Sequence, residues 1–596
     1  MPWYRISSPV SSECLPTVPD GPVYVTADCI DSIYDTRIVT SETDKTLPRP
    51  HRKATGFFQL VYPLQNSTAE DDTVAFGFDS GAYTIQTSAG VGYRGDAAAA
   101  KFSKEIAREY YGDTVEQIYG YIYGGSEYHG VWDGGLALIQ AIPISNPNNF
   151  CIRAVAGLVL GEKADQVIDA VRRGGSGNAV AGLEEVERLV LLEATALGMP
   201  LVGWEDFEGA AKNRTKLLEV LRTLVIANVK AMDPTYVDDF WSTDGYLGTE
   251  DSELGQFFRD RLVEFNATVE GIQRGADNVP VGITLNNVPE GSPSELEFTV
   301  VTGDQQDASF TGYISKEDRS VFIYSDNNAT VLDQLEEGVQ LQADNRWYPA
   351  VHTWHRNQVP SVEDRYYGYG YPRRNDGKAI YPQRDILLAR RVMVMNNLAD
   401  YDAFPWHADW YKGQVNRAVE DGFEENYHGS VPQSEQHRIV DFSGLYQQLL
   451  RDLSAWTEKG IKPPSATRSS VENSQVELPG QASRRGGIQP VVKLTAGGGN
   501  RTEVNVGTRV IFTLEAEVPP ATGKIVSVEW DWEGTGNYAK MESGRPSEKF
   551  AAQVSYSYNI AGTYVPAVRV ASHRDGDPGT PFARALNLGR VRVVVN

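Results

Sequence analysis

Short apolar runs and amphipathic stretches alternate in the first part of the chain. Buried strands are predicted at four apolar runs, 57–63, 74–78, 117–123 and 135–142. Between the second and third runs a helix is predicted, with Asp96 as its N-cap and an apolar stripe that contains Phe102 and Ile106. Strands that alternate with helices predict a largely parallel sheet covered on both faces.

The pattern changes twice in the middle of the chain. Apolar residues recur at helical spacing from about 150 to 275, and short alternating strands are predicted from about 295 to 350. A strand is then expected to end at Met395 and a final helix to run from about Phe442 to Lys459, stopped by Gly460. The sequence therefore predicts an α-then-β region inserted as a lid or cap between strands of one sheet.

The two ends differ from this body. Residues 1–50 are rich in Pro, Thr and Asp and predict an extended lead-in, and short alternating strands after residue 488 predict a β-sandwich. The predicted domains are a lead-in at 1–50, an α/β core at 51–149 and 376–465, an inserted region at 150–375, a linker rich in Pro, Ser, Arg and Gly at 466–487, and a sandwich at 488–596.

Composition narrows the class of partner. The net charge of −24 argues against nucleic acid or an anionic membrane surface as the main partner, and no apolar run has the roughly 20 residues that a membrane span needs. No signal peptide is visible, but five N-x-S/T sequons suit a secreted glycoprotein. Cys14, Cys29 and Cys151 allow either one disulfide or three thiols, and no Cys/His spacing predicts a metal site or a cofactor.

The C-terminal region resembles a PKD domain. The resemblance rests on Val528–Gly534, which reads VEWDWEG, on Tyr556–Tyr558, and on the closing segments Ala561–Tyr564 and Val568–Val570. PKD modules are Ig-like sandwiches that serve as spacers or adhesive modules, so the resemblance implies a passive spacer or a module that binds a carbohydrate or protein surface.

The body of the chain resembles α/β hydrolases of the tannase and feruloyl esterase type. The segments that carry this resemblance, in chain order, are Tyr119–Ser126, Gly130–Gly135, Asp402–Tyr411 and Leu445–Trp456. The resemblance implies an α/β-hydrolase sheet with a large inserted α+β lid, and a serine nucleophile on a tight turn, followed along the chain by an acid and then a histidine.

Those expectations select three catalytic residues. Ser126 is the expected nucleophile, Asp400 the acid after the strand that ends at Met395, and His428 the base. Asp402 and His437 are the alternatives, and either aspartate could instead cap a loop or a helix. His129 is close to Ser126 in sequence but lies on the wrong connection for this topology.

An oxyanion hole would need backbone N–H groups aimed at the developing negative charge. One is expected from Glu127, and the other from the loop after an early strand, near Gln59 to Tyr62, with Gln59 and Leu60 as candidates. In the inserted region, aromatic residues such as Trp347, Tyr348 and Trp354 could line a substrate pocket or belong to the core.

The turn at Ser126 departs from the family pattern. Only seven steps separate Ser126 from Asp133, which in a helix would span about 10 Å, less than two turns, and the closing glycine is missing. A second departure is the direct junction of residues 51–56 with the strand at Phe57; both suggest missing segments. Two functions are therefore expected: a serine esterase on a small or polymeric ester, impaired by this short turn, or an inactive binding or adhesive protein.

Overall fold

The computed structural model describes most of the chain. The described residues are 3–6, 23–27, 36–40, 56–61, 69–87, 93–111, 117–124, 131–139, 146–212, 217–275, 278–290, 295–302, 308–315, 320–325, 327, 329–333, 335–358, 391–408, 412, 427–430, 440–472 and 475–596.

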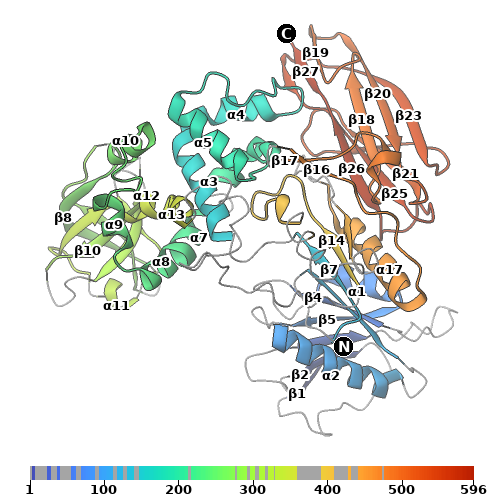
Figure 1. Ribbon diagram of the computed structural model, residues 1–596, viewed down its shortest axis with the longest axis horizontal. Helices are drawn as coiled ribbons and strands as arrows, with labels where there is room; N and C mark the ends of the chain where they lie inside the picture. The colour runs from blue at the N-terminus through green and yellow to red at the C-terminus, as the bar shows by residue number, and fades with distance from the viewer. Residues whose placement is uncertain are drawn as a thin grey trace.

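A nine-stranded sheet forms the α/β core, in the order β1-β2-β3-β5-β4-β6-β7-β14-β15 (Figure 1). Its strands are β1 (Trp3–Ile6), β2 (Val23–Ala27), β3 (Thr36–Thr40), β4 (Gly56–Val61), β5 (Ala82–Thr87), β6 (Tyr119–Gly124), β7 (Gly134–Leu138), β14 (Val392–Met395) and β15 (Tyr427–Ser430). From β5 to β15 all neighbouring strands are parallel, whereas β3 runs antiparallel to both β2 and β5. The prediction of a largely parallel sheet with helices is confirmed.

Alternation along the strands gives this sheet two apolar faces. Phe57 and Ile122 face the helix α2 (Tyr93–Tyr111) in one hydrophobic cluster. Phe58 and Tyr121 belong to the cluster on the other face, which includes the helix α17 (Ser443–Lys459). Helices therefore cover both faces, as the buried strands require.

Two predictions about the core were wrong. Residues 74–78 were expected as a strand but lie in the helix α1 (Asp71–Asp79), because their short apolar run also fits one buried helical turn. Asp96 was expected to cap α2 but lies inside it. Within residues 1–50, expected to be an extended lead-in, the described segments β1, β2 and β3 join the sheet.

The inserted region has a helical part and a closed barrel. Its helical elements are α3 (Asn146–Leu160), η2 (Gly161–Lys163), α4 (Ala164–Val171), α5 (Glu185–Ala196), η3 (Leu201–Asp206), α6 (Phe207–Ala211), α7 (Leu217–Val220), the π-helix η4 (Leu221–Ile226), α8 (Ala227–Met232), α9 (Tyr236–Ser242), α10 (Glu253–Arg259), α12 (Trp347–His352) and α13 (Trp354–Gln358). The barrel strands are β8 (Glu264–Arg274), β9 (Pro280–Leu285), β10 (Glu295–Val300), β11 (Ser309–Ile314), β12 (Val321–Ile323) and β13 (Gln340–Asp344), with α11 (Ala329–Leu332) beside them. The α-then-β order is as predicted, and the chain then returns to the helical part.

The predicted linker at 466–487 is structured where it is described. It contains the hairpin β16 (Ser470–Glu472) and β17 (Gln475–Glu477) and the short helix α18 (Ala482–Arg485). The side chain of Gln475 bonds to the inserted region, accepting from the N–H of Leu201 at 2.9 Å and donating to the carbonyl oxygen of Met199 at 3.0 Å. These two bonds of Gln475 attach the hairpin to the inserted region, so this part of the segment is a fixed connection and not a free spacer.

Antiparallel sheets make up the C-terminal part, an arrangement consistent with an Ig-like domain. Its strands are β18 (Val491–Ala496), β19 (Arg501–Val504), β20 (Arg509–Glu517), β21 (Lys524–Asp531), β22 (Ala539–Met541), β23 (Lys549–Ser557), β24 (Gly562–Tyr564), β25 (Ala567–His573), β26 (Ala585–Arg590) and β27 (Arg592–Val595). Its sheets are β18-β20-β23, β19-β27-β24 and β22-β21-β25-β26, with β19 and β27 parallel. Trp530 is buried on β21, and the carboxylate of Asp531 accepts from three backbone N–H groups in the turn that follows.

Candidate functional site

The sheet reverses its winding direction between β4 and β6. From β4 the chain moves outward to β5, and it then crosses back past β4 to reach β6 and continues toward β15. Open parallel sheets bind ligands outside the carboxyl ends of their strands at such a reversal. Val61 ends β4, Gly124 ends β6, and the two residues are paired in the register. The topology therefore marks this edge as the candidate site, and Ser126 follows it by two residues.

Gly124 holds a conformation that the other L-amino acids rarely adopt. Its φ is +98°, and a Cβ atom at this position would lie 2.3 Å from the carbonyl oxygen of Val61. Only glycine allows β6 to end this close to β4 while its backbone turns sharply. Ser126 and Glu127 lie outside the described residues, so the structure describes the turn only up to Gly124.

The connection that follows is short. Residues 125–133 join the adjacent parallel strands β6 and β7, whereas a crossover with a helix usually needs a dozen or more residues. Two hydrogen bonds join Asp133 to Gly120 of β6. The N–H of Asp133 donates to the carbonyl oxygen of Gly120 at 2.8 Å, and the carboxylate of Asp133 accepts from the N–H of Gly120 at 2.9 Å. This connection has no room for the long helix that the resemblance implies.

Gln59 and Leu60 lie inside β4, with β5 on one side and β6 on the other. Backbone N–H groups in the middle of a sheet bond to neighbouring strands, so this placement disfavours the expected oxyanion role. The buried side chain of Gln59 is also engaged, because it accepts from Trp132 Nε1 at 2.9 Å and donates to the carbonyl oxygen of Asp96 at 3.1 Å. An N–H group from the loop after Val61 would suit the role better.

Asp400 lies in the loop after β14, on the same edge of the sheet. Its Oδ1 accepts from the backbone N–H groups of Asp402 and Ala403, both at 2.8 Å. Burial raises the pKa of Asp400 to about 6, although the N–H of Ala403 stabilises the charged form. Asp400 thus has a raised pKa, and its carboxylate also accepts the hydrogen bonds that hold its own loop.

Asp402 is held by the inserted region. Its carboxylate forms an ion pair with the buried guanidinium of Arg153 on α3, and its carbonyl oxygen accepts from Asn149 Nδ2 at 3.0 Å. The same guanidinium donates to the carbonyl oxygen of Gly209 at 2.9 Å and lies 4.8 Å from the ring centroid of Tyr401. Arg153 therefore ties the candidate acid loop to the inserted helices, a contact that sequence reasoning missed because the two segments lie 249 residues apart.

His428 lies within strand β15. The register aligns it with Met393 on β14, and Met393 with Leu136 on β7, which in turn aligns with Tyr123 on β6. Three strand spacings of about 4.8 Å separate His428 from Tyr123, which is about 14 Å across the sheet. His428 follows the proposed acid and precedes α17, as expected, and the structure places it inside β15. His129 and His437 lie outside the described residues.

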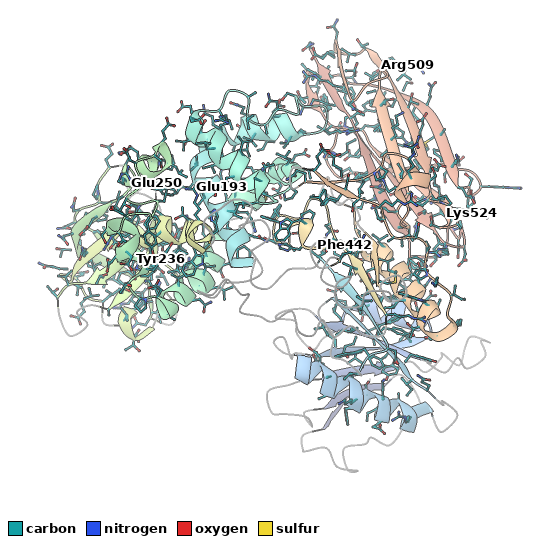
Figure 2. The ribbon with its side chains drawn as sticks, in the orientation of Figure 1. Glu193, Tyr236, Glu250, Phe442, Arg509 and Lys524 are labelled. Carbon is teal, nitrogen blue, oxygen red and sulfur yellow. The ribbon has the colours of Figure 1, made fainter. Side chains whose placement is uncertain are left out.

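A second polar cluster, also missed from the sequence, joins α5 to α13 in the inserted region. Glu193 is labelled in Figure 2. Its carboxylate lies 3.5 Å from His355 Nε2 and 3.0 Å from the guanidinium of Arg356. Burial opposes ionisation of Glu193, but hydrogen bonding to His355 and the charge of Arg356 hold its pKa well below the usual range. Beside it, Cys151 donates to the carbonyl oxygen of Val351 at 3.1 Å, and burial raises the pKa of the thiol. A fully buried thiol of this kind is structural.

The aromatic residues considered as pocket lining pack in this helical core. Tyr348 is buried, and Trp347 and Trp354 pack against the same hydrophobic cluster. The ring of Trp354 lies 5.0 Å from that of Tyr236, centroid to centroid. These three side chains therefore belong to the helical core.

Among the residues that the structure describes, no group of three or more His, Cys, Asp and Glu side chains is arranged to hold a metal ion. No helix in the described part of the chain combines the length and the apolar character needed to cross a bilayer.

Comparisons with known proteins match only part of the chain. No protein-family model and no curated protein matches it. Among solved structures, the PKD domain of an M14-like peptidase from Thermoplasmatales archaeon SCGC AB-540-F20 is 17% identical over 17% of this chain and 91% of that chain, with a TM-score of 0.14. The CARDB domain of a Pyrococcus furiosus protein is 15% identical over 18% of this chain and 88% of that chain, also with a TM-score of 0.14. Similarity at this level is confined to a short part of the chain and leaves its family open.

Proposed function

We propose that the protein is a serine hydrolase that acts on carboxylic esters through an acyl-enzyme, with Ser126 as nucleophile. The observation that carries the proposal is the position of Ser126, two residues beyond the glycine that ends β6 at the winding reversal of the sheet. In this proposal a serine on a sharp turn at that edge would meet the substrate and give its hydroxyl proton to a base supplied by a neighbouring loop. The sheet and its insertion support assignment to the α/β-hydrolase type.

Asp400 is the acid in this proposal. It lies in the loop at the carboxyl end of β14, two strands from β6, and its pKa of about 6 leaves the carboxylate ionised at neutral pH. An ionised, buried carboxylate can hold an imidazole in the productive tautomer. Asp402 is the weaker candidate because Arg153 already neutralises it.

The base is assigned to His437 in preference to His428. The carboxyl edge of a parallel sheet is reached from the loops after the strands, and a position inside a strand lies before that edge. His428 is the second residue of β15, and His437 follows that strand.

The sandwich, with Trp530 and Asp531 at the start of a tight turn, is assigned to the PKD type on its sequence motif.

The experiment combines hydrolysis of a short-chain nitrophenyl ester with labelling by a fluorophosphonate. Ser126→Ala should abolish labelling and reduce hydrolysis at least about a thousandfold. His437→Gln should cause a comparable loss, His428→Gln a loss of less than about tenfold, and the control His129→Gln little change. Equal rates for the wild type and Ser126→Ala would refute the enzymatic proposal, and a loss confined to His428→Gln would transfer the base to that residue.

The second candidate is a catalytically inactive protein that binds a carbohydrate or protein surface. It is favoured because both candidate acids already have structural partners: Asp400 accepts hydrogen bonds within its own loop, and Asp402 forms an ion pair with Arg153. The short connection after β6 also favours it. A folded wild-type protein that forms no adduct at Ser126 with the fluorophosphonate would support this second function.

A further inference from the structure

The sandwich contacts two parts of the molecule that lie far apart in sequence. In Figure 1 its β19–β27 edge lies beside α4 of the inserted region, and α17 lies between the sandwich and the core sheet. Polar contacts confirm both junctions, one with the segment 169–205 and one with α17. The predicted linker at 466–487 therefore does not separate the sandwich from the rest.

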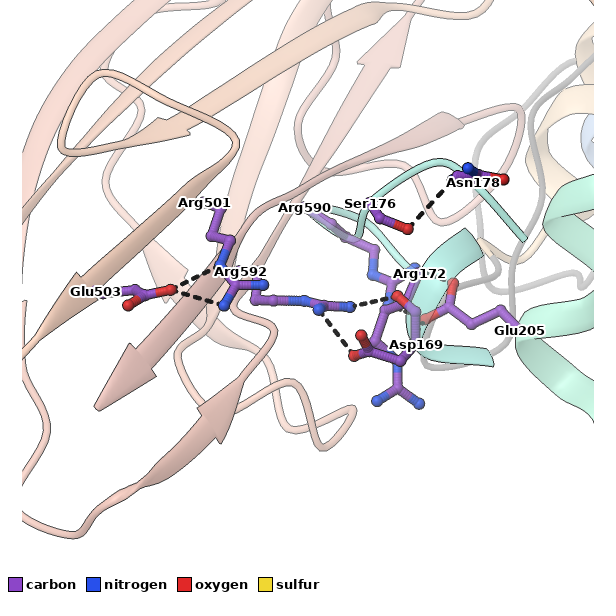
Figure 3. A network of polar contacts seen from close by, with 9 residues as sticks. All are labelled: Asp169, Arg172, Ser176, Asn178, Glu205, Arg501, Glu503, Arg590 and Arg592. Carbon is purple, nitrogen blue, oxygen red and sulfur yellow. Dashed lines mark hydrogen bonds and ion pairs between the residues drawn. The ribbon is translucent and has the colours of Figure 1, made fainter. Parts of the chain in front are cut away.

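One buried carboxylate organises the junction with the inserted region (Figure 3). Glu205 on η3 accepts two hydrogen bonds from Arg590 of β26, at 2.9 Å from Nη1 and 2.8 Å from Nη2. Its Oε1 also accepts from Nε of Arg172 at 3.2 Å. Glu205 and Arg590 are 3% and 8% exposed, so this is a two-pronged ion pair largely removed from water.

A second ion pair extends the junction. Arg592 of β27, 2% exposed, donates to the carboxylate of Asp169 at 2.8 Å and to its carbonyl oxygen at 3.0 Å. Gly174, at φ +73°, brings the following turn so close that a Cβ atom would lie 2.7 Å from the carbonyl oxygen of Asn500. The two surfaces are matched in shape as well as in charge.

The junction with the core is mainly apolar. Ile488 and Ala585 of the sandwich belong to the same hydrophobic cluster as Leu445 of α17 and Met393 of the core sheet. Around this cluster, the N–H of Ala583 donates to Gln447 Oε1 at 2.8 Å, and Arg574 pairs with Asp452 at 2.7 Å. The sandwich thus shares a core with the α/β sheet.

We propose that the sandwich is an internal brace, which fixes the inserted region relative to the α/β core through the Glu205–Arg590 and Asp169–Arg592 pairs. At the corner formed by β26 and β27, the sandwich binds the surface of the inserted region that carries Glu205 and Asp169. The Glu205–Arg590 pair is stable only while both side chains are present, because loss of Glu205 would leave the buried guanidinium without its carboxylate and loss of Arg590 would leave the buried carboxylate with Arg172 alone. The corner is therefore occupied, and an external ligand of the sandwich must use a different face.

The test is hydrogen–deuterium exchange on the full chain, read by peptide. Glu205→Gln and Arg590→Met should each raise exchange at least tenfold in both 201–206 and 585–595, because each substitution removes one half of the buried pair and leaves the remaining buried charge without its two-pronged partner. In the double variant the fold-increase in exchange should be smaller than the product of the two single fold-increases, since both substitutions remove the same ion pair. Arg501→Met and Glu503→Gln are the controls, because these residues form an exposed pair within the sandwich, 44% and 56% exposed; they should leave both segments unchanged.

Asp169→Asn provides a milder variant in case Glu205→Gln does not fold. The carboxylate of Asp169 is 65% exposed, so its loss should raise exchange severalfold in 164–175 and 592–595 without unfolding the protein. Exchange that rises on both sides of the junction supports the brace. Unchanged exchange, or a rise confined to the inserted region, would overturn it, because the pairs would then stabilise only their own side.

Discussion

A few buried polar side chains of the inserted region lack the partners that burial normally requires. His352, the last residue of α12, is buried, and neither ring nitrogen has a hydrogen-bond partner among the residues that the structure describes. Burial lowers its pKa to about 4. Tyr348, one turn earlier, is also buried, and its hydroxyl likewise has no partner in the described part of the chain. A neutral imidazole is tolerated there, whereas an imidazolium is not.

Protonation of His352 should therefore destabilise the folded protein in acid. Its pKa in the folded state lies below the ordinary value of 6.5, so the stability that the neutral form provides is present above about pH 6.5 and is lost as pH falls toward about 4. The loss should approach about 3 kcal/mol. Urea unfolding of the wild type and His352→Phe across this range should show a shallower decline for the variant; equal slopes would contradict the assignment.

The end of β6 is the element on which the candidate site depends. Its final residue turns the chain with a left-handed conformation, and the carbonyl oxygen of Val61 closes the space where a side chain would stand. The loop that carries Asp400 is set by a different element, because Arg153 on α3 holds its neighbour Asp402. The end of β6 and the loop of the proposed acid are thus placed by independent contacts.

Gly124→Ala should destabilise the protein by about 3 kcal/mol, since the left-handed conformation and the backbone clash both oppose a Cβ atom. Gly81→Ala is the matched control: its φ is +74°, but no atom lies within 4 Å of the added Cβ, so only the conformational cost of about 1 kcal/mol should appear. Chemical denaturation gives both values. A Gly124→Ala variant no less stable than Gly81→Ala would show that β6 can end in another way.

At the scale of the whole molecule, the sandwich completes the core. The helix α17 covers one face of the parallel sheet and presents its other side to the sandwich, where Gly444 lies against Arg584. A single hydrophobic cluster crosses this boundary. Bodies that share a core unfold together, in contrast to domains that are joined only by a linker.

Gly444→Ala tests this contact. The added Cβ would lie 2.0 Å from the carbonyl oxygen of Arg584, so the sandwich must move away from α17, at a cost of about 2 kcal/mol. In calorimetry the variant should unfold at a lower temperature and separate into two transitions. Gly161→Ala, where no atom lies within 4 Å of the added Cβ, is the control. A single transition at the wild-type temperature in Gly444→Ala would indicate that the interface is loose.

Local patterns predicted some elements and misread others. The apolar stripe of 442–459 and the stop at Gly460 predicted α17, because a helix of this length carries its own periodicity and its own C-cap, with Gly460 at φ +69°. Residues 74–78 gave no such signal, because a five-residue apolar run fits either a strand or a buried helical turn. The strands of residues 1–50 have little periodicity of their own and are defined by pairing, β3 with β5, β2 with β3 and β1 with β2.

The sequence alone determined the classes of structure: parallel sheet with helices, inserted α-then-β region, and terminal β-sandwich. These follow from hydrophobic periodicity and turn residues, which act between near neighbours in the chain. Only the tertiary structure decided the strand order that places the end of β6 at a winding reversal, the inclusion of His428 in β15, the ion pair of Asp402 with Arg153 and the docking of the sandwich through Glu205. Those features depend on contacts between residues tens to hundreds of positions apart, which no local pattern encodes.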